Sequence, residues 1–134
     1  MIVRDLLPKI EEKLGKGKVI VLIGPRQVGK TTLINSLLKD ISFLFLDGDD
    51  SVVANTLANA NTEILKSIIG SYKYVFIDEV QRIPNIGLKL KIIVDQIKNV
   101  QVIASGSSAF DINHVTQEPL TGRKFEYQLY PISW

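Results

Sequence analysis

The chain has 134 residues, of which 46% are hydrophobic and 22% are charged. This composition is typical of one globular domain and excludes an intrinsically disordered chain. A formal net charge of +2 is too small to indicate a nucleic-acid partner, and the lack of cysteine excludes disulfides and thiolate metal sites. No apolar run approaches the roughly 20 residues of a membrane span. We therefore expect a cytoplasmic protein that does not bind a membrane.

Apolar runs and helical periodicity divide the chain into alternating strands and helices. Strands are predicted at residues 19–23, 43–46, 74–77, 100–104 and 125–129, and helices at 5–14, from about 33 to near 40, at 52–69 and at 88–97. The strands at 19–23 and 43–46 are apolar without alternation, which predicts that both of their faces are covered. Residues 110–122 show no clear pattern.

This alternation predicts an α/β fold of three layers, with helices on both faces of a parallel sheet. Ligands of such folds bind beyond the carboxyl ends of the strands. The chain stops at Trp134 shortly after the last predicted strand, without the polar tail that is usual at a terminus. We therefore expect residues 1–134 to be one core domain cut from a longer protein.

Residues 24–32 read GPRQVGKTT and fit the Walker A pattern of a phosphate-binding P-loop. The glycines allow a tight turn whose N–H groups point at phosphates, and the start of the following helix also favours anions. Lys30 is expected to reach the β- and γ-phosphates, Thr31 to bind Mg²⁺ and Thr32 to touch the α-phosphate. The strand before the loop and the helix after it distinguish it from a chance glycine turn. The expected nucleotide-binding residues are Gly24, Pro25, Arg26, Gln27, Val28, Gly29, Lys30, Thr31 and Thr32.

Asp78 and Glu79 follow the apolar run 74–77, which is the arrangement of a Walker B motif. Behind a P-loop in the same sheet, Asp78 is placed to hold Mg²⁺, and Glu79 to orient or deprotonate the attacking water. A second acidic segment, residues 47–50, follows the strand at 43–46. We interpret it as a solvated turn, and the alternative is a carboxylate that faces the metal from a neighbouring strand.

Polar residues at the ends of later strands are further candidates. Ser105 follows the strand at 100–104, where a hydroxyl can reach the γ-phosphate or the water, and Ser107 is the alternative for this role. Arg123 precedes the last strand. It is a candidate arginine finger, which would place a positive charge on the transferred phosphoryl group, and the alternative is an ordinary surface arginine. The expected catalytic residues are thus Lys30, Glu79, Ser105 and Arg123.

Four segments follow one another along the chain in the order GPRQVGKTT, FIDEVQRIP, ASGSSAF and TGRKFEYQLYPIS. Together they resemble the prokaryotic AAA+-type ATPases, whose core precedes a C-terminal domain. The resemblance implies a five-stranded sheet in the order 5-1-4-3-2 and ATP as the nucleotide. It also implies a sensor role for Ser105 or Ser107, and a finger role for Arg123 that acts on a neighbouring subunit. The helical lid of that superfamily would follow the fifth strand, where this chain ends.

The resulting hypothesis is an Mg²⁺-dependent ATPase core that drives shape changes in domains beyond residue 134. A nucleotide-gated adaptor that binds ATP with little turnover is the alternative, and a GTPase or a small-molecule kinase is less consistent with the motifs. The hypothesis leaves open a homo-oligomer, and a nucleic-acid or protein partner bound through the missing domains.

Overall fold

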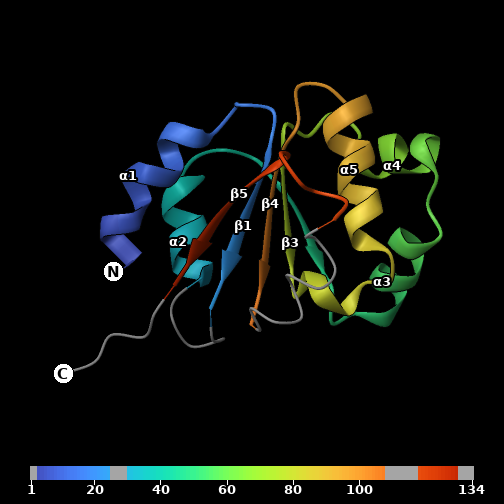
Figure 1. Ribbon diagram of the computed structural model, residues 1–134, viewed down its shortest axis with the longest axis horizontal. Coiled ribbons are helices and arrows are strands. Elements are labelled where there is room, and N and C mark those ends of the chain that lie inside the picture. The colour runs from blue at the N-terminus through green and yellow to red at the C-terminus, as the bar shows by residue number, and fades with distance from the viewer. Residues whose placement is uncertain (1–2, 25–29, 108–117, 130–134) are drawn as a thin grey trace.

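The computed structural model describes residues 3–24, 30–107 and 118–129 (Figure 1). In these ranges, the strands β1 (Val19–Ile23), β2 (Leu44–Asp47), β3 (Tyr74–Asp78), β4 (Gln101–Gly106) and β5 (Lys124–Gln128) form one sheet. Every strand pair is parallel, and the order across the sheet is β2-β3-β4-β1-β5. Read from the other side, this is the predicted order 5-1-4-3-2, so the predicted fold class is confirmed.

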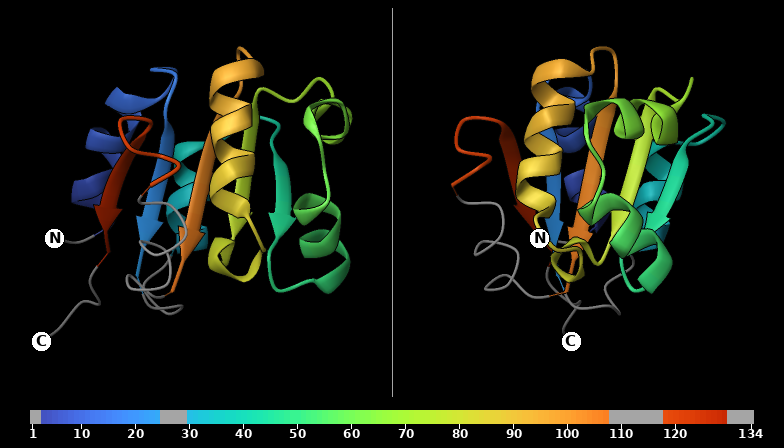
Figure 2. Two further views of the ribbon diagram at one scale, coloured as in Figure 1. Left: turned by 45° about the vertical axis from the view of Figure 1, so that its right-hand side comes forward. Right: turned by 90° about the vertical axis from the view of Figure 1, so that its right-hand side faces the viewer.

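Helices cover both faces of the sheet (Figures 1 and 2). On one face lie α1 (Val3–Lys13) and α2 (Lys30–Leu37), and on the other lie α3 (Ser51–Ala58), α4 (Thr62–Ile69) and α5 (Ile86–Gln96). Alternate residues of β1 point into the two resulting cores: Val19, Val21 and Ile23 into one, Ile20 and Leu22 into the other. All five are almost completely buried, so β1, like the equally buried β4, lies in the interior of the sheet and gives the loop that follows it a rigid base.

The single helix predicted at residues 52–69 is wrong, because the chain forms two helices there. Asn59 ends α3, and the side chain of Asn61 begins α4 by accepting a hydrogen bond from the N–H of Ile64 at 2.8 Å. Asparagine favours such capping positions over helix interiors because its side chain bonds nearby backbone groups. The break lets α3 and α4 both pack against α5.

The expectation that both faces of the second strand are covered is also wrong. β2 is the outermost strand on its side of the sheet, and its residues are only partly buried. Phe45 is 52% exposed, and its ring lies 5.5 Å from that of Phe76 on the neighbouring strand. An apolar run alone does not distinguish a central strand from an outer one.

A short 3-10 helix, η1 (Val80–Arg82), follows β3 and completes the described elements. Among the described residues, no helix has both the length and the apolar character that crossing a membrane requires. Because all strands run the same way, their ends define two distinct regions. We call them the carboxyl end of the sheet, at the bottom of Figure 1, and the amino end, at the top.

Candidate nucleotide-binding and hydrolysis site

The P-loop connects the buried strand β1 to the helix α2 at the carboxyl end of the sheet. The N–H of Gly24 donates to the carbonyl of Gly106 at 3.0 Å, which fixes the start of the loop against β4. Lys30 and Thr31 form the first turn of α2, and Thr32 is exposed there. The strand and the helix thus lie where a phosphate-binding loop requires them. The predicted ligands at 25–29 and the side chains of residues 30 and 31 lie outside the part of the structure that is described.

Asp78 is the last residue of β3 and stands at the centre of the site. One carboxylate oxygen, Oδ1, accepts a hydrogen bond from the Ser105 hydroxyl at 2.6 Å and another from the N–H of Glu79 at 2.9 Å. Ser105 is fully buried at the end of β4, the strand next to β3. These two contacts hold the Asp78 carboxylate in one orientation.

Glu79 is almost completely buried, at 3% exposure, although it carries an ionisable carboxyl group. Its backbone is left-handed, with φ 48° and ψ 49°, a conformation that costs a residue with a side chain about 1 kcal/mol or more. Its Oε2 accepts from the Gln81 amide at 2.8 Å and from the Ser107 hydroxyl at 3.1 Å. The two predicted sensor candidates are therefore divided between the acids, since Ser105 contacts Asp78 and Ser107 contacts Glu79.

Two contributors to this arrangement were not predicted from the sequence. Gln81 holds the carboxylate of Glu79, and its own carbonyl oxygen Oε1 is buried without a hydrogen-bond partner in the structure as described. Gly48, after β2, packs against the left-handed turn, and its N–H donates to the carbonyl of Asp78 at 2.8 Å. A Cβ atom at Gly48 would collide with the carbonyl of Glu79 and lie 2.6 Å from that of Asp78. The turn at Glu79 thus depends on a glycine thirty-one positions earlier in the sequence.

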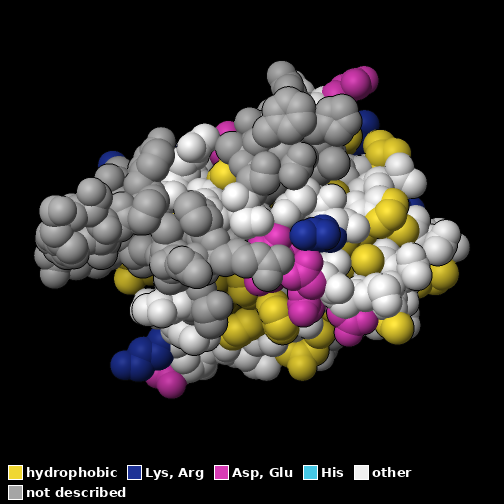
Figure 3. Space-filling model, turned by 90° about the horizontal axis from the view of Figure 1, so that it is seen from below, with side chains coloured by type: hydrophobic (Ala, Val, Ile, Leu, Met, Phe, Trp, Pro, Cys, Tyr) yellow, Lys and Arg dark blue, Asp and Glu magenta, His cyan; other side chains and the backbone are white. Residues whose placement is uncertain are grey.

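The acidic segment at 47–50 has contacts typical of a turn. Asp50 caps α3 by accepting from the N–H groups of Val52 and Val53, and Asp47 accepts from the N–H of Asp49 at 2.9 Å. These contacts favour the interpretation as a turn over a metal-facing carboxylate. Asp47 still lies beside Asp78 in the register of β2 and β3, so acidic side chains gather at this end of the sheet (Figure 3).

The donor set at Asp78 fits a magnesium ion. Carboxylate oxygen is a ligand type that Mg²⁺ prefers, and it is usually combined with water and substrate phosphates rather than with a complete protein cage. Both of the hydrogen bonds above involve Oδ1, so Oδ2 of Asp78 has no hydrogen bond in the described ranges. Among the described residues, no three or more His, Cys, Asp or Glu side chains form a group that could hold a metal ion.

Arg123 lies at the other end of the sheet, directly before β5. Its Nε donates to Asp95 at the end of α5 at 2.9 Å, and its carbonyl accepts from the N–H of Val19 at 2.9 Å. The hydrogen bond from Arg123 lowers the pKa of Asp95 and raises the pKa of Arg123 itself. Within one chain, the structure therefore brings together Asp78, Glu79, Ser105 and Ser107 but not Arg123.

Comparison with known proteins places this site in a family. Residues 16–134 match the AAA domain family AAA_14. An uncharacterized protein of Mycobacterium tuberculosis and one of Mycobacterium bovis are each 31% identical over 121 residues, which is 90% of this chain. The chain spans only 26% of the length of these two relatives.

Solved structures share the fold at low sequence identity. The Walker-type ATPase PABY2304 of Pyrococcus abyssi has a TM-score of 0.69 at 16% identity, with 96% of this chain and 53% of the other covered. A chain from the Drosophila ORC bound to DNA has a TM-score of 0.66 at 14% identity, with 96% and 89% covered. The chain belongs to the AAA domain family, as a P-loop domain of the nucleotide-binding, ATPase type.

Proposed function

We propose that the protein binds ATP and hydrolyses it with the help of Mg²⁺. The observation that supports this best is the pair Asp78 and Glu79, oriented by Ser105, Ser107 and Gln81 beside the start of a P-loop. A carboxylate pair held by four donors, with Glu79 buried and Asp78 partly buried, is more ordered than an acidic turn needs to be. Carboxylates held by several donors next to a phosphate-binding loop are a typical arrangement of catalytic sites.

The substrate phosphates would be held by the backbone N–H groups of residues 24–32 and by the side chain of Lys30. Thr31 and Asp78 would bind the magnesium ion, which when bound neutralises charge that develops on the phosphate oxygens. In the described part of the chain, contacts with Ser105 and the N–H of Glu79 orient the side chain of Asp78.

Glu79 would act on the attacking water. The water oxygen forms a bond to the γ-phosphorus while the bond from that phosphorus to the β-phosphate oxygen breaks, and Glu79 accepts the water proton. ADP and phosphate are the products. Gln81 and Ser107 hold the carboxylate in place through Oε2. Ser105 would report the state of the γ-phosphate through Asp78.

In the whole protein, hydrolysis would drive shape changes in parts beyond this core, since the matched relatives are about four times as long. Arg123 would act as an arginine finger on the ATP site of a neighbouring copy, because it lies at the amino end of the sheet, opposite the ATP site of its own chain. Residues 1–134 would then form one ATPase core in a homo-oligomer, with a protein or nucleic-acid partner bound elsewhere. We propose the cytoplasm as its location.

One observation favours a second candidate, an adaptor gated by ATP with little turnover. Glu79 is buried and its Oε2 already accepts two hydrogen bonds, so the carboxylate has to keep or regain access to water before it can act as a base. If nucleotide binding does not give it that access, ATP would change the shape of the domain without being cleaved.

The test is phosphate release at several protein concentrations, together with binding of a fluorescent ATP analogue. We expect Glu79→Gln to bind the analogue normally and to lose at least about a hundredfold in turnover, the lower range for general base catalysis. Lys30→Ala should lose both. Glu63→Gln, on the exposed start of α4, is the matched control and should change neither.

The outcomes separate the two candidates. Normal turnover in Glu79→Gln would refute the assignment of Glu79 as the base. Tight ATP binding without turnover in the unmodified protein would support the adaptor instead.

A further inference from the structure

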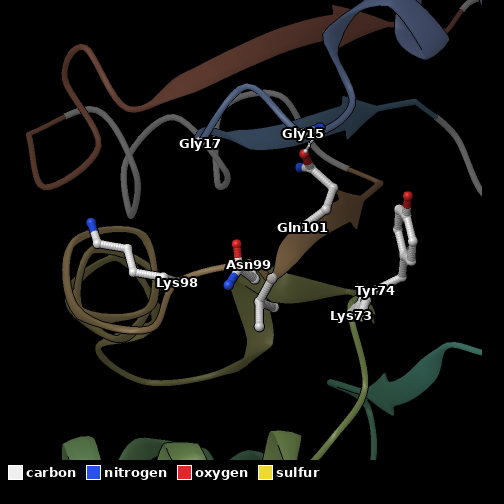
Figure 4. A pocket seen from close by; sticks show the side chains of 8 residues that line it. Gly15, Gly17, Lys73, Tyr74, Lys98, Asn99 and Gln101 are labelled. Carbon is white, nitrogen blue, oxygen red and sulfur yellow. Dashed lines mark hydrogen bonds between the residues drawn. The ribbon is translucent and has the colours of Figure 1, made fainter.

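Three neighbouring cavities run along the amino end of the sheet, away from the proposed ATP site. The central one, of about 440 Å³, lies between the loop at Gly15 and Gly17 and the starts of β3 and β4 (Figure 4). A second, of about 120 Å³, shares Lys98 and Asn99 with it, and a third, of about 500 Å³, shares Lys73 and Tyr74. Because adjacent cavities have lining residues in common, we treat them as one feature, the amino-end groove.

The charge of the groove is of one sign. The cationic residues that line the three cavities are Lys18, Lys73 and Lys98, and no aspartate or glutamate lines any of them. Lys73 and Lys98 are exposed and form no ion pair among the residues described. The nearest acid on α5, Asp95, is bound by Arg123. The charge of Lys98 also contributes to lowering the pKa of Asp95, without a direct ion pair between the two side chains. An anionic ligand would therefore meet two exposed lysines that form no ion pair among the described residues.

One wall of the groove is held in place before any ligand binds. Gln101 at the start of β4 is 6% exposed, and its side chain joins the wall to the loop before β1. Its Oε1 accepts from the N–H of Gly15 at 2.9 Å, and its Nε2 donates to the carbonyl of Lys18 at 2.8 Å. The loop that carries Lys18 is thus fixed to the strand at the bottom of the groove, which reduces the ordering cost of binding.

Aromatic and small polar side chains are interleaved with the lysines. Tyr72 is 39% exposed and Tyr74 partly exposed on either side of Lys73, and Ser42, Ser71 and Asn99 add hydrogen-bonding groups. In Figure 4, Lys98 and Tyr74 lie on opposite sides of the groove with Asn99 between them. Lysine for phosphate and an aromatic face for bases is the combination with which proteins bind single strands.

We propose that the amino-end groove binds single-stranded nucleic acid. Lys73 and Lys98 contact successive phosphates, and an unstacked base lies against Tyr72. A double helix keeps its bases stacked and inaccessible to Tyr72, and an acidic peptide uses the lysines but not the tyrosines. The proposal does not depend on ATP hydrolysis, because the groove and the acid pair lie at opposite ends of the sheet.

The test is fluorescence anisotropy of a labelled 20-nucleotide oligo-dT with the purified protein at 50 and 200 mM salt. We expect Lys73→Glu with Lys98→Glu to weaken binding at least tenfold at 50 mM salt and to flatten the salt dependence, because each lost phosphate contact removes about 0.7 from the log–log slope. The matched control is Lys9→Glu with Lys66→Glu, on exposed positions outside the groove. Each double variant lowers the formal net charge by the same four units.

Variants of Tyr72 test the aromatic contact. We expect Tyr72→Ala to weaken binding of the oligonucleotide about fivefold or more, and Tyr72→Phe, which keeps the ring, to stay within about twofold of the unmodified protein. Circular dichroism of each variant confirms that the fold is intact. A Tyr72→Ala variant that is folded and binds normally would contradict the proposed stacking.

Other outcomes would overturn the proposal as a whole. These are no binding at 50 mM salt, equal weakening in the lysine control, or displacement of the labelled strand equally well by duplex DNA or by polyglutamate. The ATP proposal is tested separately, since Lys30→Ala should keep oligonucleotide binding, and the Lys73 and Lys98 double variant should keep binding of the ATP analogue.

Discussion

The two ends of the sheet differ in charge and in how that charge is held. At the carboxyl end, Asp78 and Glu79 are tied to hydroxyl, amide and backbone donors, and Glu79 is nearly inaccessible to water. At the amino end, the segments that lead into four of the strands carry five lysines and one acidic residue, Asp40. The segments are 14–18, 38–43, 70–73 and 97–100, and the lysines are Lys16, Lys18, Lys39, Lys73 and Lys98. The first region is built around fixed anions, and the second exposes cations.

The difference follows from the cost of burying charge. A carboxylate removed from water needs partners at once, so the carboxyl end has strict local geometry in which each substitution disturbs several contacts. An exposed lysine is solvated and needs no partner, so the amino end should tolerate substitution well. We therefore expect changes at the carboxyl end to cost folding stability as well as activity, and changes of the exposed lysines at the amino end to affect binding more than stability.

Gly48→Ala should have the largest effect on stability. The new methyl group would collide with the backbone at Asp78 and Glu79, which cannot move aside as a flexible side chain could. Overpacking costs about 1–3 kcal/mol and occasionally more, and we expect this clash to reach or exceed the upper end of that range. Gly17→Ala at the amino end is the control, since nothing lies within 4 Å there and only its positive φ of 78° is unfavourable, at about 1 kcal/mol. Urea unfolding of both variants measures the difference. Equal losses would show that Gly48 is not a close contact, and the comparison of the two ends would fail there.

Ser105→Ala and Ser107→Ala should separate the two hydroxyls at the carboxyl end. Loss of a hydrogen bond to a charged group costs about 1.5–3 kcal/mol when buried. Ser105 is fully buried and contacts Asp78 at 2.6 Å, whereas Ser107 is partly exposed and contacts Glu79 at 3.1 Å. We expect Ser105→Ala to cost more free energy of unfolding and Ser107→Ala to act mainly on turnover. The reverse ranking would assign the orienting role to Ser107.

Asp95→Asn should have the smallest effect on stability, since its ion pair with Arg123 is exposed. The pKa of Asp95 is lowered in the folded protein, so the pair stabilises the fold above the ordinary aspartate pKa and this contribution is lost as pH falls through the lowered value. The difference in melting temperature between the variant and the unmodified protein should therefore be larger at pH 7 than at pH 2.5. If the difference in melting temperature is the same at both pH values, the charge of Asp95 contributes nothing to folding stability.

The same pair tests the arginine finger. If Arg123 acts on a neighbouring copy, ATP turnover per chain should rise with protein concentration in the unmodified protein. Arg123→Ala should abolish this rise, and Asp95→Asn should retain it. Equal turnover in the unmodified protein, Arg123→Ala and Asp95→Asn would show that Arg123 is a structural residue of the amino end and not a finger.

The strands and their helical neighbours were predictable because they depend on local pattern. Buried parallel strands are apolar throughout, and Val19–Ile23 was predicted to the residue. The order of the sheet came from the resemblance to AAA+ proteins rather than from periodicity, because it depends on which distant strands pair. The covering of β2 was predicted wrongly for the same reason, since its place at the side of the sheet is a property of the whole fold.

The acid pair was predictable from its position after an apolar strand, but its supporting contacts were not. Gln81 reaches Glu79 only because Glu79 adopts a left-handed conformation, and Gly48 matters only because that turn presses against it. The amino-end groove was missed altogether, since its lysines lie in loops that are far apart in the sequence and each of them looks like an ordinary surface residue.

The central position of β1 has a consequence for how the protein is made. Its neighbours are β4 and β5, so Ile20 pairs with Ile103 on one side and with Phe125 on the other. A ribosome releases β1 long before either partner, and the most apolar strand of the domain then waits unpaired while the intervening chain is synthesised. Such long-range pairing slows folding and exposes the nascent chain to aggregation. Within this domain, the strand that precedes the P-loop is therefore synthesised well before both of its partners and is paired late.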